Sequence, residues 1–164
     1  MLGRVRKGSA EEVRMPRRTI RLLNRLIRTC RDGEGTCRAW SEAAASPGLR
    51  ELLTGRAQQW GRQGDELQAL VLMLGGRPAL SGTPAGQLLR GWVALKSLAL
   101  GRADLPVLLD WEHSQRLALR RYQQVLAERL SERVRRTLTL QARSLSAHHH
   151  RLEDLRGHFA AHIP

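Results

Sequence analysis

The stretch 60–96 constrains the fold of this chain more than any other, because it contains the end of one helix, a connector and a second helix. Apolar residues recur there in steps of three and four up to Leu74, which predicts an amphipathic helix. Gly75 and Gly76 end this helix, because glycine adopts a left-handed cap conformation that other residues avoid. After a connector rich in Pro, Gly and Ser, Pro84 begins a shorter helix. The fold question is therefore how long helices pack before and after this connector.

Four long helices are predicted in all, and no strand pattern competes with them. Pro16 suits the first turn of helix one, and Ser46 with Pro47 marks the start of helix two. Asp104 is predicted to cap helix three, and Ser131 to cap helix four. The predicted inward-facing positions recur in steps of three and four on each helix. They are Ile20, Leu23, Ile27, Cys30, Glu34, Cys37, Ser41 and Ala44 in helix one, Leu49, Leu53, Ala57, Trp60, Gly64, Leu67, Val71 and Leu74 in helix two, Leu105, Leu108, Glu112, Gln115, Leu119, Tyr122 and Leu126 in helix three, and Val134, Leu138, Gln141, Leu145, His148, Leu152, Leu155 and Phe159 in helix four.

The connector between helices two and three, about thirty residues with a helix inside it, is long enough to travel one bundle length and let these two helices run parallel. We therefore predict an all-α fold: a ferritin-like four-helix bundle with a short crossing helix between helices two and three, in which Trp92 packs against the bundle. Residues 15–164 should form this single domain, and residues 1–14 a flexible basic tail. Met1 and Met15 both stay open as the true start.

The charge balance of the chain is unusual. It has 28 Lys and Arg residues against 15 Asp and Glu, a formal net charge of +13, and all but two of the basic residues are arginine. Such an excess favours an acidic partner, which includes nucleic acid, anionic lipid and acidic proteins. The alternative is that the arginines lie on solvated faces and bind nothing.

No apolar run approaches the roughly 20 residues that a transmembrane helix needs, and the basic N-terminus lacks the apolar core of a signal peptide. We therefore expect a cytoplasmic protein. Cys30 and Cys37 fall on one predicted helix, so their Cα atoms should lie ~10 Å apart. This separation is too large for a disulfide, and two free buried thiols suit a reducing compartment.

Five segments of the chain carry a resemblance to known proteins: DGEGTCRAW, GDELQALVLMLGGRP, GQLLRGWVALK, the stretch from Trp111 to Tyr122, and AHHHRLEDL. Together they resemble a bacterial family of ferritin-like proteins of unknown function. The resemblance covers roughly residues 20–156, and the portion around the Leu-Gly-Gly and Arg-Gly-Trp motifs is its most specific part. It implies a four-helix bundle with a short crossing helix, and it implies no established activity.

Glu34, Glu112 and either His148 or His149 are the sharpest chemical candidates. Counting turns along each helix in the ferritin-like topology puts them near one height and facing inward. Carboxylates and imidazole that converge in a bundle core are the ligand set of di-iron and di-manganese sites, so these four residues are candidate ligands of iron or manganese. The full pattern requires two Glu-x-x-His motifs, and neither occurs in this chain.

Comparison with the family weakens the metal interpretation. Where relatives typically have a second Glu after Asp-Gly-Glu, this chain has Gly35, and where they have Gly-Glu-Asp, it has Ser114, Gln115 and Arg116. Glutamine keeps the hydrogen bonding of glutamate but loses the charge that holds a hard cation. We therefore expect no cofactor and favour a buried polar layer in which Glu34, Gln115 and a histidine satisfy one another and fix the helix register.

Arginines crowd one end of the predicted bundle, where the starts of helices one and four meet the end of helix three. The opposite end collects acidic residues, so the molecule should be strongly dipolar. No aromatic platform or base-reading motif accompanies the arginines, so any binding of nucleic acid should be non-specific and steeply dependent on salt. The candidate polyanion-binding residues are Arg18, Arg21, Arg25, Arg28, Arg133 and Arg136.

We interpret the chain as a non-catalytic structural or interaction protein, because no catalytic motif emerges from its residues. Two alternatives stay open. One is a di-metal carboxylate protein with iron or manganese, and the other is a non-specific binder of nucleic acid or another polyanion through the arginine-rich end. A homo-oligomer is also compatible with the sequence.

Overall fold

The computed structural model describes the backbone of residues 6–101 and 103–161, and the side chains within 16–99, 101 and 103–147. This part of the chain forms five α-helices and contains no β-strand, so the all-α prediction is confirmed. The proposed flexible tail over residues 1–14 lies outside the described side chains and stays a prediction. The helices are α1 (Arg6–Ala43), α2 (Pro47–Met73), α3 (Pro84–Leu100), α4 (Asp104–Leu126) and α5 (Glu132–Ala161).

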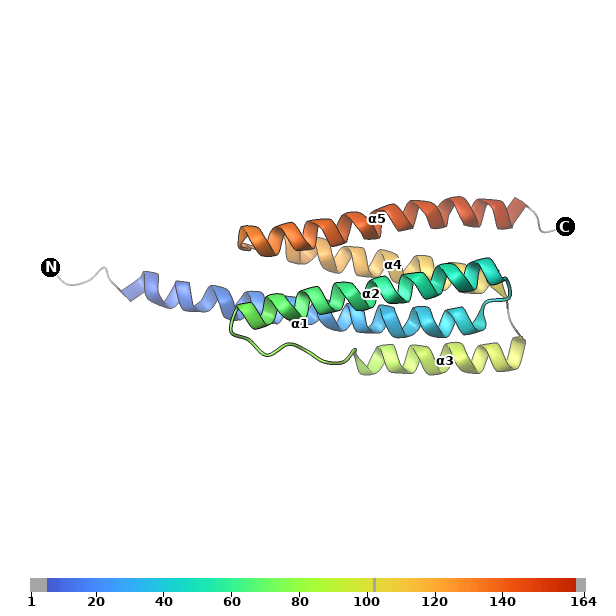
Figure 1. Cartoon of the computed structure of the whole chain (residues 1–164), viewed down its shortest axis with the longest axis horizontal. Helices are drawn as coiled ribbons and strands as arrows, with labels where there is room; N and C mark the ends of the chain where they lie inside the picture. The colour runs from blue at the N-terminus through green and yellow to red at the C-terminus, as the bar shows by residue number, and fades with distance from the viewer. Residues whose placement is uncertain (1–5, 102, 162–164) are drawn as a thin grey trace.

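Polar contacts at the two ends of the molecule show how the long helices run. Asp104, the first residue of α4, accepts hydrogen bonds from the backbone N–H groups of Ala45 (2.7 Å) and Ser46 (3.1 Å), so α4 begins beside the turn between α1 and α2. At the other end, a guanidinium nitrogen of Arg18 lies 2.7 Å from a carboxylate oxygen of Glu128, just after α4. The helix α1 is therefore antiparallel to both α2 and α4, which run in the same direction (Figure 1).

Two predicted helix starts differ from the structure. The helix α1 begins at Arg6, so Pro16 lies inside it rather than in its first turn. Asp104 does not cap α4, because the N-cap residue is Ala103 and the Asp104 carboxylate binds the neighbouring turn instead. Ser46 does cap α2, as predicted, since its hydroxyl accepts a hydrogen bond from a backbone N–H of the first turn.

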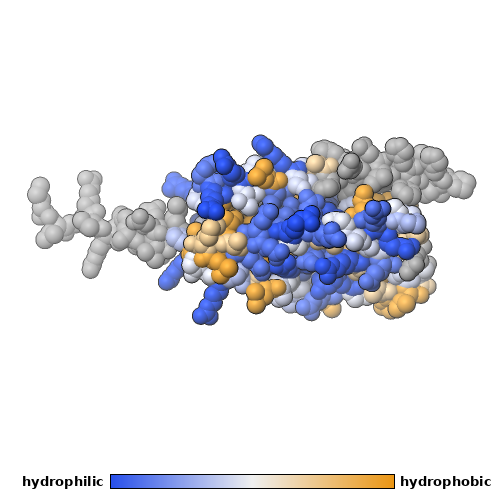
Figure 2. Space-filling model, in the orientation of Figure 1, coloured by the Kyte–Doolittle hydropathy of each residue, from blue (hydrophilic) through white to orange (hydrophobic). Residues whose placement is uncertain are grey.

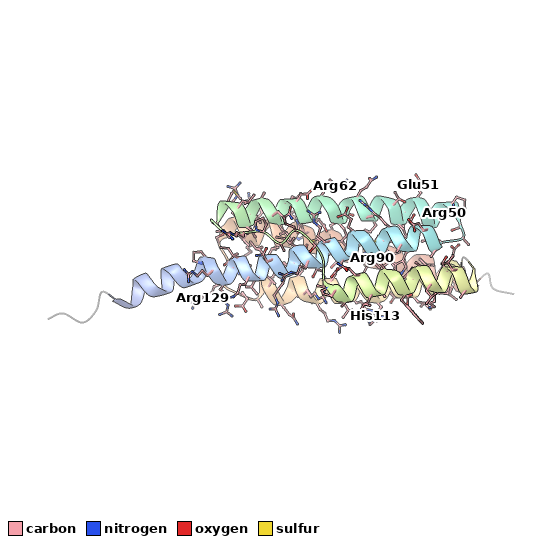
Figure 3. The ribbon with its side chains drawn as sticks, turned by 90° about the horizontal axis from the view of Figure 1, so that it is seen from below. Arg50, Glu51, Arg62, Arg90, His113 and Arg129 are labelled. Atoms are coloured by element: carbon pink, nitrogen blue, oxygen red, sulfur yellow. The ribbon has the colours of Figure 1, made fainter. Side chains whose placement is uncertain are left out.

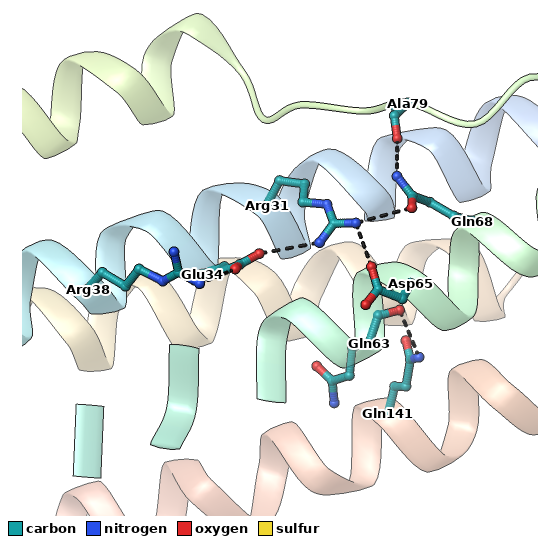
Figure 4. Close-up of polar contacts among 8 residues, drawn as sticks. All are labelled: Arg31, Glu34, Arg38, Gln63, Asp65, Gln68, Ala79 and Gln141. Atoms are coloured by element: carbon teal, nitrogen blue, oxygen red, sulfur yellow. Dashed lines mark hydrogen bonds and ion pairs between the residues drawn. The ribbon is translucent and has the colours of Figure 1, made fainter. Parts of the chain in front are cut away.

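Two polar side chains hold the connector between α2 and α3 against the long helices. Asn24 of α1 donates to the carbonyl of Arg77 (3.0 Å) and accepts from the N–H of Ala79 (2.7 Å). The Ala79 carbonyl accepts from Gln68 of α2 (2.7 Å; Figure 4). Each of these bonds satisfies a peptide group that would otherwise need water. The connector therefore follows a defined path along α1 after Gly75, whose φ of +71° ends α2.

Asp32 of α1 fixes the start of α3. Its two carboxylate oxygens accept from the backbone N–H of Thr83 (2.8 Å) and from the Thr83 hydroxyl (2.7 Å). Thr83 is in turn the N-cap of α3, because its hydroxyl oxygen accepts from the N–H of Gly86 (3.0 Å). A carboxylate at the N-terminus of a helix also interacts favourably with the helix dipole. The position of α3 along α1 therefore depends on this one side chain.

The core lies between α1, α2, α4 and α5, and most of the predicted inward-facing apolar positions are buried in it. The exceptions among the described side chains, which are only partly buried, are Ile20, Leu74, Leu105, Leu119 and Leu126. Gly33 permits a close approach of α1 and α2, because a Cβ atom there would come within 2.7 Å of the Trp60 ring. Trp40, Trp60 and Trp111 are buried. Trp92 on α3 is 57% exposed, so the prediction that it packs against the bundle is wrong. Val93 is the buried residue of α3 at this height.

Within the described part of the chain, no helix combines the length and the apolar character needed to cross a membrane.

The Asp32→Ala substitution should lower the free energy of unfolding by about 2–3 kcal/mol, because two hydrogen bonds to a charged acceptor are lost and the start of α3 is released. Urea titration followed by circular dichroism measures this change. Asp65→Ala is the matched control, since Asp65 is a largely exposed carboxylate paired with Arg31 and should contribute less than about 1 kcal/mol. Equal losses in the two variants would contradict the role assigned to Asp32.

Candidate functional site

Glu34 lies at the edge between α1 and α2, where two arginines bind it. Its carboxylate accepts from Arg31 (3.3 Å) and from Arg38 (2.6 Å), and the side chain is 20% exposed (Figure 4). A Cβ atom at Gly61 would lie 3.4 Å from this carboxylate, so α2 packs directly against it. Arg31 also donates to Asp65 of α2 (2.7 Å). Glu34 therefore belongs to an ion-pair network that joins α1 to α2 near the surface.

Glu112 and Gln115 are buried one turn apart on α4. A carboxylate oxygen of Glu112 lies 3.7 Å from the guanidinium of Arg116. The carboxamide of Gln115 is assigned with its oxygen toward two donors, accepting from Trp111 Nε1 at 2.9 Å and from Arg56 Nε at 3.0 Å. Gln115 thus satisfies a buried arginine of α2 and a buried tryptophan of its own helix. The predicted contact of Gln115 with Glu34 is therefore wrong, because Arg56 is the partner of Gln115 from the neighbouring helix. The histidine of the predicted layer lies outside the described side chains.

Arg56 carries a guanidinium in the interior, is only 3% exposed, and was not among the site residues predicted from the sequence. Its guanidinium lies over the Trp60 ring, 4.8 Å from the ring centroid, a cation–π contact, and it also donates to Gln59. Burial lowers the pKa of Arg56 to about 10, because a charged group is disfavoured away from water. The sequence did contain a signal that Arg56 is buried. Arg56 and Gln63 continue the alternating steps of three and four that relate Leu53, Trp60 and Leu67.

A chain of polar groups crosses the core from α1 to α2 through α4 and α5. The Cys30 thiol lies 3.3 Å from the Tyr122 hydroxyl, which donates to the Gln141 side-chain oxygen at 2.8 Å. The Gln141 amide nitrogen donates to Glu66 (2.7 Å) and to the Gln63 carbonyl (3.3 Å; Figure 4). Since Tyr122 donates to Gln141, its oxygen is free to accept from Cys30. This chain joins all four long helices at one register.

Both cysteines are free and buried, as predicted. Burial raises the pKa of the Cys30 thiol to about 12, although the hydrogen bond with Tyr122 acts in the opposite direction. Burial likewise raises the pKa of Cys37 to about 12. Tyr122 also has a raised pKa, again mainly because of burial. These groups are neutral near neutral pH, and the thiols lack the thiolate that nucleophilic or metal-binding cysteines need.

The structure places only part of the predicted metal site. Glu112 is in the interior and Glu34 is in the surface network, whereas the side chains of His148 and His149 lie outside the described residues. Among the side chains that are described, no three His, Cys, Asp or Glu groups converge where a metal ion could bind. Arg56 brings a positive charge and Gln115 a neutral amide to the middle of the core, and neither suits a pair of hard cations.

The candidate polyanion-binding arginines of α1 lie together on one side of that helix. Arg18, Arg21, Arg25 and Arg28 are all exposed. On the neighbouring helix α4, Arg120 and Arg121 are exposed as well, and Arg121 donates to Thr29 of α1 at 3.1 Å. The two groups of arginines therefore line a shared surface between α1 and α4, here called the arginine face. Its members are Arg18, Arg21, Arg25, Arg28, Arg120 and Arg121.

The arginine face has few acidic neighbours along the chain. Segments 16–29 and 113–127 together hold eight arginines and no Asp or Glu. Arg18 is paired with Glu128, just beyond the second segment. Arg133 and Arg136 are exposed at the start of α5, at this same end of the molecule (Figure 1). Like charges that are held this close raise the local positive potential.

Comparison with known proteins identifies one family. The family described as Domain of unknown function (DUF2383) matches residues 18–128. The matched region runs from Arg18 on α1 to Glu128 just after α4, so it includes the connector, α3 and the whole arginine face. No curated protein matches the sequence.

The two cysteines should resist modification until the protein unfolds. Because burial raises both pKa values from 9.0 to about 12, the native thiols should react with a disulfide reagent at about pH 8 at less than about 1% of the unfolded rate. Absorbance of the released thiolate, with and without urea, measures this difference. The same pKa shift makes the free energy of unfolding depend on pH. Because the folded-state pKa is above the unfolded value, the cysteines contribute to this free energy below pH 9, and the contribution is lost as the pH rises toward 12. Rapid labelling of either cysteine in the native protein would contradict this assignment.

Tyr122→Phe should destabilise the protein by about 1–3 kcal/mol, because it leaves the buried Gln141 oxygen without its donor. Chemical denaturation measures the change. Gln123→Ala on the exposed side of α4 is the control, and it should change stability by less than about 0.5 kcal/mol. If Tyr122→Phe matched the control, the polar chain would contribute nothing to holding α4 and α5 together.

Proposed function

Because the chain belongs to the family described as Domain of unknown function (DUF2383), its role has to be inferred from its own residues, and we propose that it is a non-catalytic, ferritin-like four-helix-bundle protein that binds polyanions through the arginine face. Two arguments support the ferritin-like topology. The helices α2 and α4 run in the same direction, and the segment between them contains a short helix that returns along α1 (Figure 1).

The state of the interior supports a structural rather than a catalytic core. Its polar side chains bind one another across the helices, as Tyr122 with Gln141 and Gln115 with Arg56 do. The thiols are neutral and buried, so they are poor nucleophiles. Buried polar groups that bind one another across helices specify which helix faces meet, and this is the role that we assign to them. We expect the protein to act in the cytoplasm, where free thiols persist.

The observation that carries the binding proposal is that segments 16–29 and 113–127 together contain eight arginines and no acidic residue. Most of these side chains are exposed and therefore hydrated, so they can exchange counterions for phosphates. The guanidinium group binds phosphate oxygens in a two-pronged geometry that lysine cannot offer. No base-reading element accompanies them in the described part of the chain, so the binding should depend on charge and not on sequence.

A fluorescently labelled DNA duplex is a suitable polyanion probe, read by anisotropy. The protein should bind it at ~50 mM salt, with an affinity that falls steeply as salt is raised, because counterion release drives the association. Arg21→Glu combined with Arg25→Glu should weaken binding at least tenfold and reduce the slope of log affinity against log salt by about 2 or more. Absence of binding at low salt would contradict the proposed function.

A matched pair of single variants separates the arginine face from net charge. Arg25→Glu and Arg62→Glu change the charge of the protein equally, but Arg62 is an exposed residue of α2, on a different helix from the arginine face (Figure 3). Arg25→Glu should weaken DNA binding several-fold more than Arg62→Glu does. Equal effects would show that overall charge, and not this surface, attracts the polyanion.

A further inference from the structure

The outer side of α3 is an apolar ridge. Leu88, Trp92, Leu95 and Leu98 follow one another in steps of four and three, which places them on one side of the helix. They are exposed by 77%, 57%, 58% and 86%, respectively. Figure 2 shows apolar side chains gathered at the lower edge of the molecule, where α3 runs. Four large apolar side chains exposed in one row are uncommon on a protein surface and mark a binding surface.

The orientation of α3 is fixed by contacts on its inner side. Asp32 binds the first turn through Thr83, Val93 is buried, and Arg90 points toward α1, with its guanidinium 3.9 Å from the Asp32 carboxylate. Both charged residues of the helix, Arg90 and Lys96, are partly buried beside the ridge rather than on it. The ridge is therefore held outward and carries no charge of its own.

The apolar ridge and the arginine face lie on the same side of the molecule. Asp32, which α3 covers, belongs to the row of α1 that continues backwards through Arg28, Arg25 and Arg21 in steps of four, three and four. The helix α3 therefore covers this row from Asp32 onward, whereas the arginines that precede Asp32 in the row stay exposed. Seen from below, α3 overlies one half of this side and leaves the other half uncovered (Figure 3).

We propose that this side of the protein binds the surface of an anionic lipid bilayer, with the α3 ridge inserted among the lipids and the arginine face on the headgroup phosphates. The proposal rests on the proposed function, because it names the polyanion that the arginine face meets. It assigns the ridge a partner that offers apolar and negatively charged groups in adjacent layers. Helices that lie in the membrane interface combine Leu and Trp on one side with cationic groups close by.

The height of the ridge fits a bilayer surface. A helix with its side chains is about 10 Å across, so α3 stands about that far above the neighbouring open part of α1. Interfacial helices bury their apolar side roughly 5–10 Å deep, at the boundary between headgroups and acyl chains. Insertion of α3 to this depth therefore brings the arginines of the open half level with the phosphates. Trp92 then lies in the layer that tryptophan prefers.

Charge distinguishes the bilayer from a second copy of the chain as the partner of the ridge. Two copies that each carry +13 repel one another, whereas an anionic surface attracts both copies. Each arginine near such a surface strengthens binding by about fivefold. DNA would bind the arginine face but would make no apolar contact with the ridge. A bilayer can contact the arginine face and the ridge at the same time.

Trp92 is a built-in reporter for this proposal. Trp40, Trp60 and Trp111 are exposed by 2%, 3% and 2%, so a change in tryptophan fluorescence on binding arises mainly from Trp92. With vesicles of phosphatidylcholine containing roughly a third phosphatidylglycerol, the emission should shift to shorter wavelength and become protected from acrylamide. Vesicles of phosphatidylcholine alone should give neither change. Trp92→Phe should abolish the spectral change while leaving co-sedimentation with the anionic vesicles largely intact.

Variants of the two surfaces separate this inference from the proposed function. Leu88→Ser with Leu95→Ser should weaken vesicle binding at least tenfold and leave DNA binding unchanged. Leu72→Ser with Leu140→Ser, two exposed leucines of α2 and α5, is the matched control and should change neither. Circular dichroism verifies that each variant is folded. Arg21→Glu with Arg25→Glu should weaken both vesicle and DNA binding.

Three outcomes would overturn the bilayer proposal. The first is intact vesicle binding in the Leu88 and Leu95 variant, and the second is an unchanged Trp92 signal with anionic vesicles. The third is protection of Trp92 that appears with rising protein concentration in the absence of lipid, which would identify a second copy as the partner. In each case DNA binding by the native protein would still support the arginine face as a polyanion site.

Discussion

The hydrogen bonds from Thr83 to the Asp32 carboxylate determine where α3 begins, and the rest of the structure depends on that position. After α2 ends at Gly75, the connector must return along α1 for α4 to start beside the turn at Ala45. Asn24 guides its first half, and Asp32 ends the path by anchoring the N-cap of α3. A carboxylate supplies two acceptors for this purpose and complements the dipole of the helix that follows.

The Asp-Gly-Glu sequence on α1 shows how three adjacent residues can serve packing rather than catalysis. Asp32 holds α3, Gly33 makes room for the Trp60 ring, and Glu34 joins Arg31 and Arg38 in the surface network. Farther inside, neutral groups share hydrogen bonds across helices, and the one buried guanidinium, among the residues described, rests on an aromatic ring. Such an interior favours one pairing of helix faces, because another register would break these hydrogen bonds between buried groups.

The helix α3 covers the acidic half of one side of the molecule and leaves the basic half exposed. The halves of α1 and α4 at the end where α3 lies, residues 30–43 and 104–112, contain six acidic and two basic residues, whereas the open halves contain eight arginines and no acid. An apolar ridge thus lies over the acidic half, and the basic half stays accessible next to it. This arrangement lets one side of the protein combine apolar contact with attraction to negative charge, which neither surface achieves alone.

The sequence by itself determined the helices and most of their buried faces, because the spacing of apolar residues and the Gly, Pro and Ser signals are local. The buried positions of Leu23, Leu53 and Leu138 follow directly from that spacing. The tertiary structure alone decided the partners of polar groups: Gln115 binds Arg56, Glu34 binds two arginines, and Trp92 faces outward. These outcomes depend on which side chains from distant segments share a height and a face. Periodicity places a residue on one helix but does not reveal what the neighbouring helix presents to it.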